Sequence, residues 1–440
     1  MKSWSIECQS KRRLEILTLY KKFMAPFFDA EGQWNNSDTE IGMREKLWHC
    51  IALLEGNDGD ITLANKILGL LKLERCHFAP MNCMELLLGH ENRLTGENVH
   101  KLEEYVKESI SRQADKKVHF TMYNDNFAAM ATFTLLTAGE RFGDIRAFSA
   151  GKARLVQLAK RYMRTGAIME YCSPTYLPLN IHAIAQIVNY VNSKEIKGLA
   201  LKCEERMWVE AATHFHAPSS HLAGPYSRAY TVDTVGHPHL VMFALFLVLG
   251  EDVFINPVND MFPPHPGQLI HVSLERLMWP NMAWICCGRV HCPDYLADHL
   301  LNKTYPYITI ARTECLPSHT KGTRKDTETG NQVSVDNPYE YGAFSGPIYT
   351  YMTADFALGT AYSQYHDGGL SESFYAVYRK RKDAKRLQDT GVVFCRYIIN
   401  ERKPEEKYNY SVYGQADGFY TFRDEARKFG IQHKDCSMLV

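Results

Sequence analysis

The sequence has no excess of charge of either sign and no long basic run. Lys and Arg together number 50, as do Asp and Glu, so the formal net charge at neutral pH is zero. A nucleic-acid-binding protein needs clustered Lys and Arg to neutralise phosphates. The short basic cluster at 379–382 is typical of a solvated turn. We therefore expect no nucleic-acid partner.

Long apolar segments are also missing. Residues 1–13 contain no apolar stretch of ~7–15 residues of the kind that signal peptides carry. The longest apolar run, 240–249, is much shorter than the ~20 residues of a membrane-spanning helix, so it is predicted to be a buried core helix. We therefore expect a cytoplasmic protein without a membrane span.

The twelve cysteines follow no metal or disulfide pattern. None of them forms a CxxC pair, and Cys286, Cys287 and Cys292 do not have zinc-ligand spacing with His291. The sequence also lacks a GxGxxG motif after a strand, a GxxxxGK[ST] loop and a DDxxD-like acidic cluster. We therefore expect reduced thiols, no metal site and no cofactor.

Apolar residues at helical spacing fill the chain from its start to about residue 250. Short polar breaks between the predicted helices indicate antiparallel helix pairs, and Asp60 is a predicted N-cap. Such pairs form a bundle, an open solenoid or a closed α/α toroid. The absence of a fixed-period repeat favours the toroid, over residues 1–262. The predicted helices include 61–73, 80–91, 98–112, 125–139, 144–164, 177–192, 196–214 and 238–249.

After the proline-rich segment 263–267, β-branched and aromatic residues take over. The segment 320–330 is polar and is predicted to be a loop. No strand alternates with a helix, so the strands are expected to be antiparallel. The sequence thus predicts a mainly α protein, an α/α toroid followed by a smaller antiparallel β region over 263–440. The predicted strands are 305–311, 344–352, 373–378, 392–399, 408–413 and 429–440.

The first half of the candidate site is a turn at residues 170–176, which read EYCSPTY. Pro174 disfavours helix at Ser173, so the chain must turn before a helix that begins near Leu177. A carboxylate that is fixed by a turn can serve as a general acid or base. It can equally hold the turn through a salt bridge to an arginine, and both interpretations of Glu170 remain open.

The second half is a turn at residues 224–230, which read GPYSRAY. In an extended strand Tyr226, Arg228 and Tyr230 would share one face. A guanidinium offers a planar fork of donors, and phenols both stack and donate hydrogen bonds, so this face suits a carboxylate, a carbonyl or a sugar ring. The alternative is a cation–π or salt-bridge clamp that holds the loop.

Two histidines lie between the turns. His214 and His216 precede Pro218, which predicts that a helix ends there. Either histidine could act as a general base or hydrogen-bond donor near neutral pH, and a capping or core role is the alternative. His237 follows the second turn closely enough to fold back onto it.

Polar residues also precede the predicted helix 125–139. Asn124 or Asp125 is an obvious N-cap, and the remaining polar groups, with Tyr123, would lie at the mouth of the helix. The sequence therefore predicts two sets of site residues. The catalytic set is Glu170, His216, Tyr226, Arg228 and Tyr230, and the substrate-binding set is Tyr123, Asn124, Tyr171, Tyr176, His214 and His237.

The two turns resemble the EYNSPTY and AGPHSRxY turns of large microbial and fungal proteins. Those proteins have an α/α toroid followed by an antiparallel β-sandwich, as in the heparinase-like polysaccharide lyases and related glycosidases. The segments 124–126, 357–361 and 432–434 support the resemblance, which implies this fold and a carbohydrate-active enzyme. The chain departs from the pattern where Cys172 replaces an Asn and Tyr226 a His, and Val440 falls where those proteins continue their sandwich.

Three functions remain open. We favour an intracellular, cofactor-independent enzyme of fungal secondary metabolism, of the cyclase or Diels–Alderase type, that folds and cyclises or isomerises a small hydrophobic metabolite. It would act by orientation and by hydrogen bonds to a carbonyl group. The second is a uronate polysaccharide lyase or glycoside hydrolase, with Arg228, Tyr230 and His216 as its reactive groups. The third is a ligand-binding protein without catalysis. The oligomeric state is left open.

Overall fold

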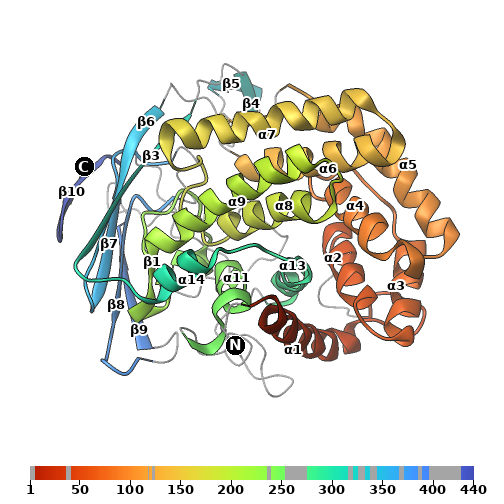
Figure 1. Cartoon of the computed structure of the whole chain (residues 1–440), viewed down its shortest axis with the longest axis horizontal. Helices are drawn as coiled ribbons and strands as arrows, with labels where there is room; N and C mark the ends of the chain where they lie inside the picture. Colours follow the sequence, from red (N-terminus) through yellow and green to blue (C-terminus); the bar gives the residue numbers. More distant parts are fainter. Residues whose placement is uncertain are drawn as a thin grey trace.

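The computed structural model describes residues 5–35, 41–116, 118–120, 124–234, 239–252, 275–315, 321–325, 332–336, 344–365, 371–384, 389–395 and 428–440. This part of the chain is mainly helical and carries a smaller antiparallel sheet towards the C-terminus, as Figure 1 shows. The α-helices are α1 (Ile6–Met24), α2 (Met43–Leu54), α3 (Asp58–Leu70), α4 (Ala79–His90), α5 (Gly96–Gln113), α6 (Asp125–Phe142), α7 (Ile145–Thr165), α8 (Tyr176–Tyr190), α9 (Lys194–His214), α10 (Thr231–Thr234), α11 (His239–Leu249), α13 (Glu275–Cys287) and α14 (Asp294–Leu301).

The strands form one larger sheet and three two-stranded pairs. The larger sheet has the order β3-β6-β7-β8-β9 and is antiparallel throughout, and the pairs are β1-β2, β4-β5 and β10-β11. The strands are β1 (Phe215–His216), β2 (His221–Leu222), β3 (Tyr307–Cys315), β4 (Lys321–Lys325), β5 (Gln332–Asp336), β6 (Phe344–Met352), β7 (Phe356–Ala361), β8 (Phe374–Arg379), β9 (Thr390–Phe394), β10 (Gly430–His433) and β11 (Cys436–Leu439).

The contacts between helices run in a cycle. Consecutive helices pack as pairs, α2 with α3, α4 with α5, α6 with α7 and α8 with α9. In addition, α2 contacts α4, α4 contacts α6, α6 contacts α8, α8 contacts α11, α11 contacts α13, and α13 contacts α2 again. We call α2, α4, α6, α8, α11 and α13 the inner helices. We call the other members of the pairs, α3, α5, α7 and α9, together with α1, the outer helices.

The two sets of helices begin differently. The outer helices α1, α3, α5, α7 and α9 each start with a side chain that accepts a hydrogen bond from a first-turn amide. Helix α3 begins earlier than predicted because Asn57 is its N-cap and Asp60 completes a capping box from the third helical position. In the described part of the chain, the N-cap residues of α2, α4, α6 and α8 make no such side-chain bond.

Two inner helices are buried nearly all round. The predicted core helix 240–249 is confirmed as α11, whose residues from Leu240 to Leu249 are buried. In α8 every residue from Tyr176 to Ile187 is buried, including polar ones. Asn180 lies one turn after Tyr176, whereas His182 and Gln186 lie on a different face of the helix. The polar side chains of α8 must therefore find partners inside the protein.

The sheet packs against the second of the predicted turns. A cis peptide bond joins Gly224 to Pro225, and the Gly224 carbonyl accepts a hydrogen bond from Thr350 Oγ1 at 2.8 Å. A side chain on Gly359 of β7 would meet that carbonyl, because a Cβ there would lie 1.6 Å from the Gly224 oxygen. Backbone bonds between Tyr226 and Glu372 continue the contact at 2.9 and 3.0 Å. The sheet thus fixes where the turn begins.

The predicted β region is confirmed in part. The strand 344–352 matches β6, and 429–440 contains the hairpin β10-β11. The loop expected at 320–330 is wrong in its first half, because residues 321–325 form β4, which pairs with β5. Strand β7 was not predicted, because Ala, Gly and Thr dominate its sequence. The predicted strand 408–413 lies outside the described residues.

Candidate functional site

The two predicted turns are in direct contact. Ser227 donates to the Tyr171 carbonyl from its hydroxyl at 2.8 Å and from its amide at 3.2 Å. In return, the Ser173 hydroxyl donates to the Arg228 carbonyl at 2.6 Å. The expectation that the turns converge is therefore confirmed. The serine side chains bond the backbone across the contact, so they hold the two turns together.

Glu170 lies at the centre of this contact and is fully buried. Arg228 Nη1 donates to Glu170 Oε1 at 2.9 Å and to Asn124 Oδ1 at 2.9 Å. Asn126 donates to Glu170 from its amide at 2.7 Å and from its side chain at 2.6 Å, and Asn180 donates from α8 at 3.3 Å. The Glu170 carboxylate thus serves as the missing N-terminal cap of α6, where the helix dipole favours a negative charge.

A second buried carboxyl supports the first. Asp125 Oδ2 accepts a hydrogen bond from the Glu170 amide at 2.9 Å, and Asp125 Oδ1 lies 3.3 Å from Arg161 Nη1. Burial raises the pKa of Asp125 to about 7, and the Glu170 charge adds to that rise while Arg161 opposes it. Burial also raises the pKa of Glu170, although the Arg228 charge opposes it. In each carboxyl, the neighbouring arginine opposes the rise in pKa that burial causes.

Two tyrosine hydroxyls complete the cluster. The Arg228 guanidinium carbon lies 3.9 Å from the centroid of the Tyr176 ring, and the Tyr176 and Tyr230 hydroxyl oxygens are 2.5 Å apart. The Tyr230 amide and the Thr175 hydroxyl both donate to Asp233 Oδ2, at 3.0 and 2.8 Å. Burial raises the pKa of Tyr230 far above its usual value, so its hydroxyl stays protonated and can donate a hydrogen bond.

The prediction that Tyr226 shares a face with Arg228 and Tyr230 is wrong. The backbone bends at 227–228, so the alternation of an extended strand is lost between the first and second of these residues. The Tyr226 hydroxyl donates to the Leu222 carbonyl at 2.5 Å, and its ring packs 4.5 Å from that of Tyr375 in β8. Tyr226 therefore packs on the sheet.

The two histidines at the end of α9 also lie away from the cluster. His216 bonds Ser219 Oγ at 2.7 Å and the Thr353 carbonyl at 2.8 Å, which places it against the turn between β6 and β7. His214 Nδ1 lies 3.0 Å from the Glu210 carbonyl, and its Nε2 has no partner among the described residues. Burial lowers the pKa of both rings to about 4, so both are neutral at physiological pH.

Three other predicted residues have simpler outcomes. Tyr171 is buried and joins the cluster through its backbone carbonyl, since its hydroxyl has no partner in the described part of the chain. Tyr123 and His237 lie outside the described residues. Sequence reasoning missed Asn126 and Asn180 as partners of Glu170. The spacing of Asn180 in an apolar helix gave no signal, whereas Asn126 stands one residue after the predicted N-cap.

A second polar cluster crosses the ring of inner helices. Glu85 in α4 accepts a hydrogen bond from Trp284 Nε1 at 2.6 Å and lies 2.7 Å from His182 Nε2 in α8. Helix α6 lies between α4 and α8 in the cycle of contacts, so this bond spans the interior. The Trp284 ring also stacks on Trp48 in α2 at 5.3 Å. These contacts join side chains of α2, α4, α8 and α13.

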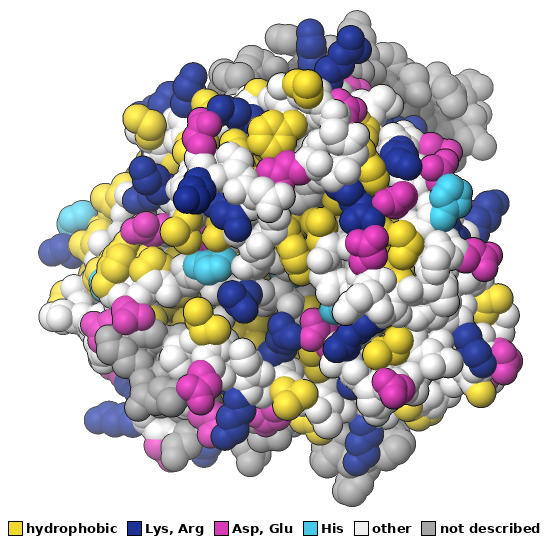
Figure 2. All heavy atoms as spheres, turned by 45° about the vertical axis from the view of Figure 1, so that its right-hand side comes forward, with side chains coloured by type: hydrophobic (Ala, Val, Ile, Leu, Met, Phe, Trp, Pro, Cys, Tyr) yellow, Lys and Arg dark blue, Asp and Glu magenta, His cyan; other side chains and the backbone are white. Residues whose placement is uncertain are grey.

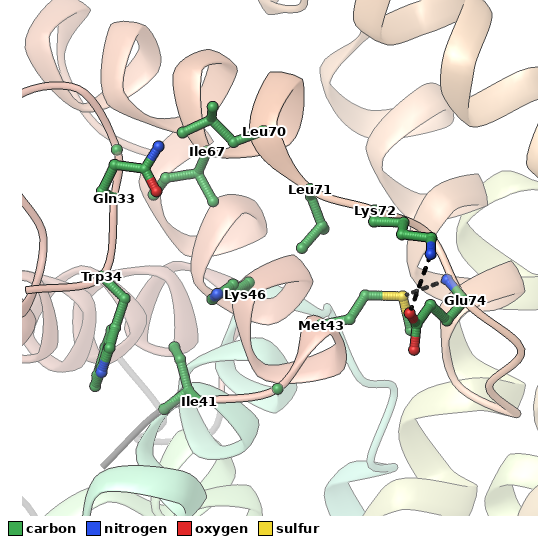
Figure 3. A pocket seen from close by; sticks show the side chains of 12 residues that line it. Gln33, Trp34, Ile41, Met43, Lys46, Ile67, Leu70, Leu71, Lys72 and Glu74 are labelled. Carbon is green, nitrogen blue, oxygen red and sulfur yellow. Dashed lines mark hydrogen bonds and ion pairs between the residues drawn. The ribbon is translucent and has the colours of Figure 1, made fainter. Parts of the chain in front are cut away.

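A separate pocket of about 390 Å³ lies on the outer side of α2 (Figure 3). None of the predicted site residues lines it, so it does not belong to the cluster around Glu170. Its lining residues come from the segment before α2, from α2 itself and from the end of α3 onward: Gly32, Gln33, Trp34, Ile41, Gly42, Met43, Lys46, Ile67, Leu70, Leu71, Lys72 and Glu74.

Three properties of the described residues bear on ligands and partners. They contain no group of three His, Cys, Asp or Glu side chains placed to hold a metal ion. No helix among them is both long and apolar enough to cross a bilayer. On the face shown in Figure 2, basic and acidic side chains are interspersed with apolar ones, and neither sign forms a continuous field.

The cluster lies within the part of the chain that a family model matches. A family model described as a domain of unknown function (DUF8769) matches residues 84–266. The matched segment contains both turns and every predicted site residue. Neither the comparison with curated proteins nor that with solved structures finds a match.

Proposed function

We propose that the inner and outer helices form a closed α/α toroid and that the chain is an intracellular enzyme acting on a small organic substrate at one end of it. The cycle of contacts from α2 back to α2 supports the toroid. The reaction we favour is isomerisation or cyclisation of a largely apolar metabolite that carries a carbonyl or carboxylate oxygen. Orientation in an enclosed site supplies much of the rate of such reactions.

One observation carries this proposal: Arg228 pairs with the buried Glu170 carboxylate and lies over the ring of Tyr176, whose hydroxyl is paired with that of Tyr230. Glu170 and Asn124 fix the guanidinium, so it is positioned before a substrate arrives. Arg228 and a protonated tyrosine hydroxyl would then donate hydrogen bonds to a substrate oxygen on which negative charge develops. Such donors in a buried site stabilise the transition state because they need little reorganisation.

The test uses the fact that isomerisation and cyclisation conserve molecular formula. Cells from which the gene has been deleted would be complemented with the wild-type protein or with Tyr230→Phe, and their metabolites compared by mass spectrometry. We expect Tyr230→Phe cells to accumulate a precursor that has the same mass as the wild-type product but a different retention time. The Phe ring keeps the packing and removes only the hydroxyl.

Tyr378→Phe is the matched control, because Tyr378 lies in β8 and is 40% exposed. Tyr378→Phe should restore the wild-type metabolites in full. If Tyr230→Phe also restores them, Tyr230 takes no part in catalysis. If neither wild type nor variant changes any metabolite relative to the deletion, the proposed reaction is overturned.

A uronate lyase is the second candidate, and the same cluster favours it. Arg228 could neutralise a uronate carboxylate, and a tyrosine could move the proton at the neighbouring carbon. Elimination creates a double bond, so purified protein mixed with uronate oligosaccharides would show a rise in ultraviolet absorbance. Shortened, unsaturated products in that assay would replace the isomerase proposal with the lyase.

A further inference from the structure

In two ion pairs at the same end of the helix ring, the arginine is more exposed than the glutamate. In the pair Arg228–Glu170, the arginine side chain is 13% exposed and the glutamate 0%. In the pair Arg44–Glu45, the arginine side chain is 22% exposed and the glutamate 6%. Both pairs are neutral overall, yet in each the cation is the outer member. In both pairs the more exposed group is therefore the guanidinium.

Arg44 lies in the first turn of α2, and its guanidinium is held on three sides. Glu45 Oε1 accepts hydrogen bonds from Arg44 Nε at 2.8 Å and from Nη2 at 2.5 Å. The guanidinium carbon lies 4.8 Å from the Trp48 ring and 5.0 Å from the Phe78 ring. A planar guanidinium that is stacked and bonded in this way is pre-organised to bind a carboxylate.

Ring contacts among Trp48, Trp284 and His182 show where Arg44 lies relative to the Tyr176–Tyr230 pair. Trp48 lies one turn after Arg44 in α2, and His182 lies less than two turns after Tyr176 in α8. Trp284 touches both, with ring centroids 5.3 Å from Trp48 and 4.6 Å from His182. The starts of α2 and α8 therefore lie on the same side of this layer. Consistent with this, the Arg44 charge lowers the pKa of Tyr230, although burial dominates that pKa.

Aromatic side chains, which we call the aromatic wall, lie near the starts of α4 and α6. Phe78 stands immediately before α4 and is partly buried, and Phe127 in the first turn of α6 is partly buried as well. The exposed His77 stacks on Phe127, with ring centroids 4.0 Å apart and planes 10° apart. Partial burial of the stacked ring, together with the charges of Arg75 and Arg112, lowers the pKa of His77. The wall suits the face of a ring.

We propose that this end of the protein binds a ring that bears a carboxylate, with Arg44 and Arg228 facing the carboxylate and Phe78, His77 and Phe127 facing the ring. The inference rests on the proposed function for the place of the site and adds the chemical class of the substrate. Both an aromatic acid and a sugar acid have this chemistry. The experiment below distinguishes them.

Binding of three probes to the purified full chain would be measured by isothermal titration calorimetry. The probes are 2-naphthoate, its neutral analogue 2-naphthamide, and glucuronate. We expect wild type to bind at least one of the two acids, and Arg44→Gln to bind that acid about tenfold or more weakly. Binding of 2-naphthamide should not change in Arg44→Gln, because the amide carries no charge for the arginine to meet.

Arg44→Lys and Arg146→Gln are the controls. Arg44→Lys keeps the charge and should restore part of the affinity, and Arg146→Gln removes an exposed charge from α7 and should change nothing. Thermal unfolding followed by circular dichroism would check that each variant folds. Binding of 2-naphthoate alone would identify an aromatic acid, and binding of glucuronate alone a sugar acid.

Two outcomes would overturn the inference: neither acid binds the wild type, or Arg44→Gln binds the acid as tightly as wild type does. Because these measurements record binding without turnover, they are independent of the metabolite test. If Tyr230→Phe restores the wild-type metabolites while Arg44→Gln binds the acid more weakly, the proposed reaction is wrong and the proposed ligand class still holds.

Discussion

Arg228 Nη1 lies 2.9 Å from Glu170 Oε1, although 58 residues separate the two in the chain. The pair joins the only two turns that the sequence singled out, and it does so where α6 begins. A buried carboxylate at that position meets a helix N-terminus, an arginine and two asparagine amides. Two interpretations of Glu170 were open, a general acid or base and a salt bridge that holds the turn. The structure shows the salt bridge, and its partner is Arg228.

Replacing Glu170 should destabilise the fold. Glu170→Ala leaves the Arg228 guanidinium without its carboxylate, and breaking a buried ion pair typically costs about 3–5 kcal/mol. Urea unfolding would measure the loss, and the double variant with Arg228→Ala should lose less than the sum of the two single variants. Glu195→Ala is the control. Its pair with Lys152 is exposed and should contribute no more than about 1 kcal/mol. A Glu170→Ala variant as stable as this control would contradict the prediction.

Stability should fall as the pH rises towards neutral. Glu210 is fully buried behind Cys172, whose amide donates to it at 2.7 Å, and burial raises the Glu210 pKa from 4.5 to about 7. Between those two values the folded state binds a proton that the unfolded state has lost, so each pH unit removes up to about 1.4 kcal/mol. Glu210→Gln should make the decline less steep in urea unfolding at a series of pH values. An unchanged slope would show that Glu210 ionises normally.

A side chain at Gly359, where β7 contacts the second turn, should destabilise the fold. Gly359→Ala would place a Cβ 1.6 Å from the Gly224 carbonyl oxygen, which is backbone and cannot rotate away. We expect a loss of about 3 kcal/mol in urea unfolding, at the upper end of overpacking effects. Gly198→Ala in α9, where a Cβ meets nothing within 4 Å, should instead gain about 0.5–1 kcal/mol. Equal stability of the two variants would refute this view of the sheet contact.

The stability of the fold should depend on Glu85, which accepts the hydrogen bonds of the cluster across the helix ring. Glu85→Ala leaves the donors of Trp284 and of its other partners buried without an acceptor, at about 1–3 kcal/mol for each unsatisfied group. We therefore expect a total loss of about 3 kcal/mol or more, and a smaller loss for Glu85→Gln, which retains one oxygen. Chemical unfolding would measure both, with the exposed Glu97→Ala within about 0.5 kcal/mol of wild type as the control. A Glu85→Ala loss no larger than that of the control would contradict a cross-ring role.

The helices could be predicted because their signals are local. Apolar spacing placed the buried run 240–249 in a helix, and Pro174 placed the start of α8 within one residue. The start of α3 was missed by three residues because Asn57 and Asp60 bond each other reciprocally, and either residue alone can serve as a cap. In β7, Gly359 lowers the strand propensity, yet the close approach of Gly224 requires a glycine there.

The candidate site could be predicted only in part. The two turns were correctly expected to meet, and Arg228, Tyr230, Tyr176, Asn124 and Glu170 do lie in one cluster. Tyr226 and His216 were expected there and instead pack on the sheet. Their chain spacing is compatible with either direction, and the partners that decide it, Glu372 and Thr353, lie next to strands of the sheet and well over a hundred residues along the chain.

Spacing and composition by themselves determined the helical character, the antiparallel β region, the balance of charge and the two rigid turns, because each of these depends on neighbours a few residues apart. Only the tertiary structure decided which side chains meet. Asn180 and Arg44 look like ordinary helix residues in the sequence, and they acquire a role because α8 and α2 begin at the same end of the inner helices. Burial then raises the pKa of Asp125 and Glu210 to about 7, which no local pattern specifies.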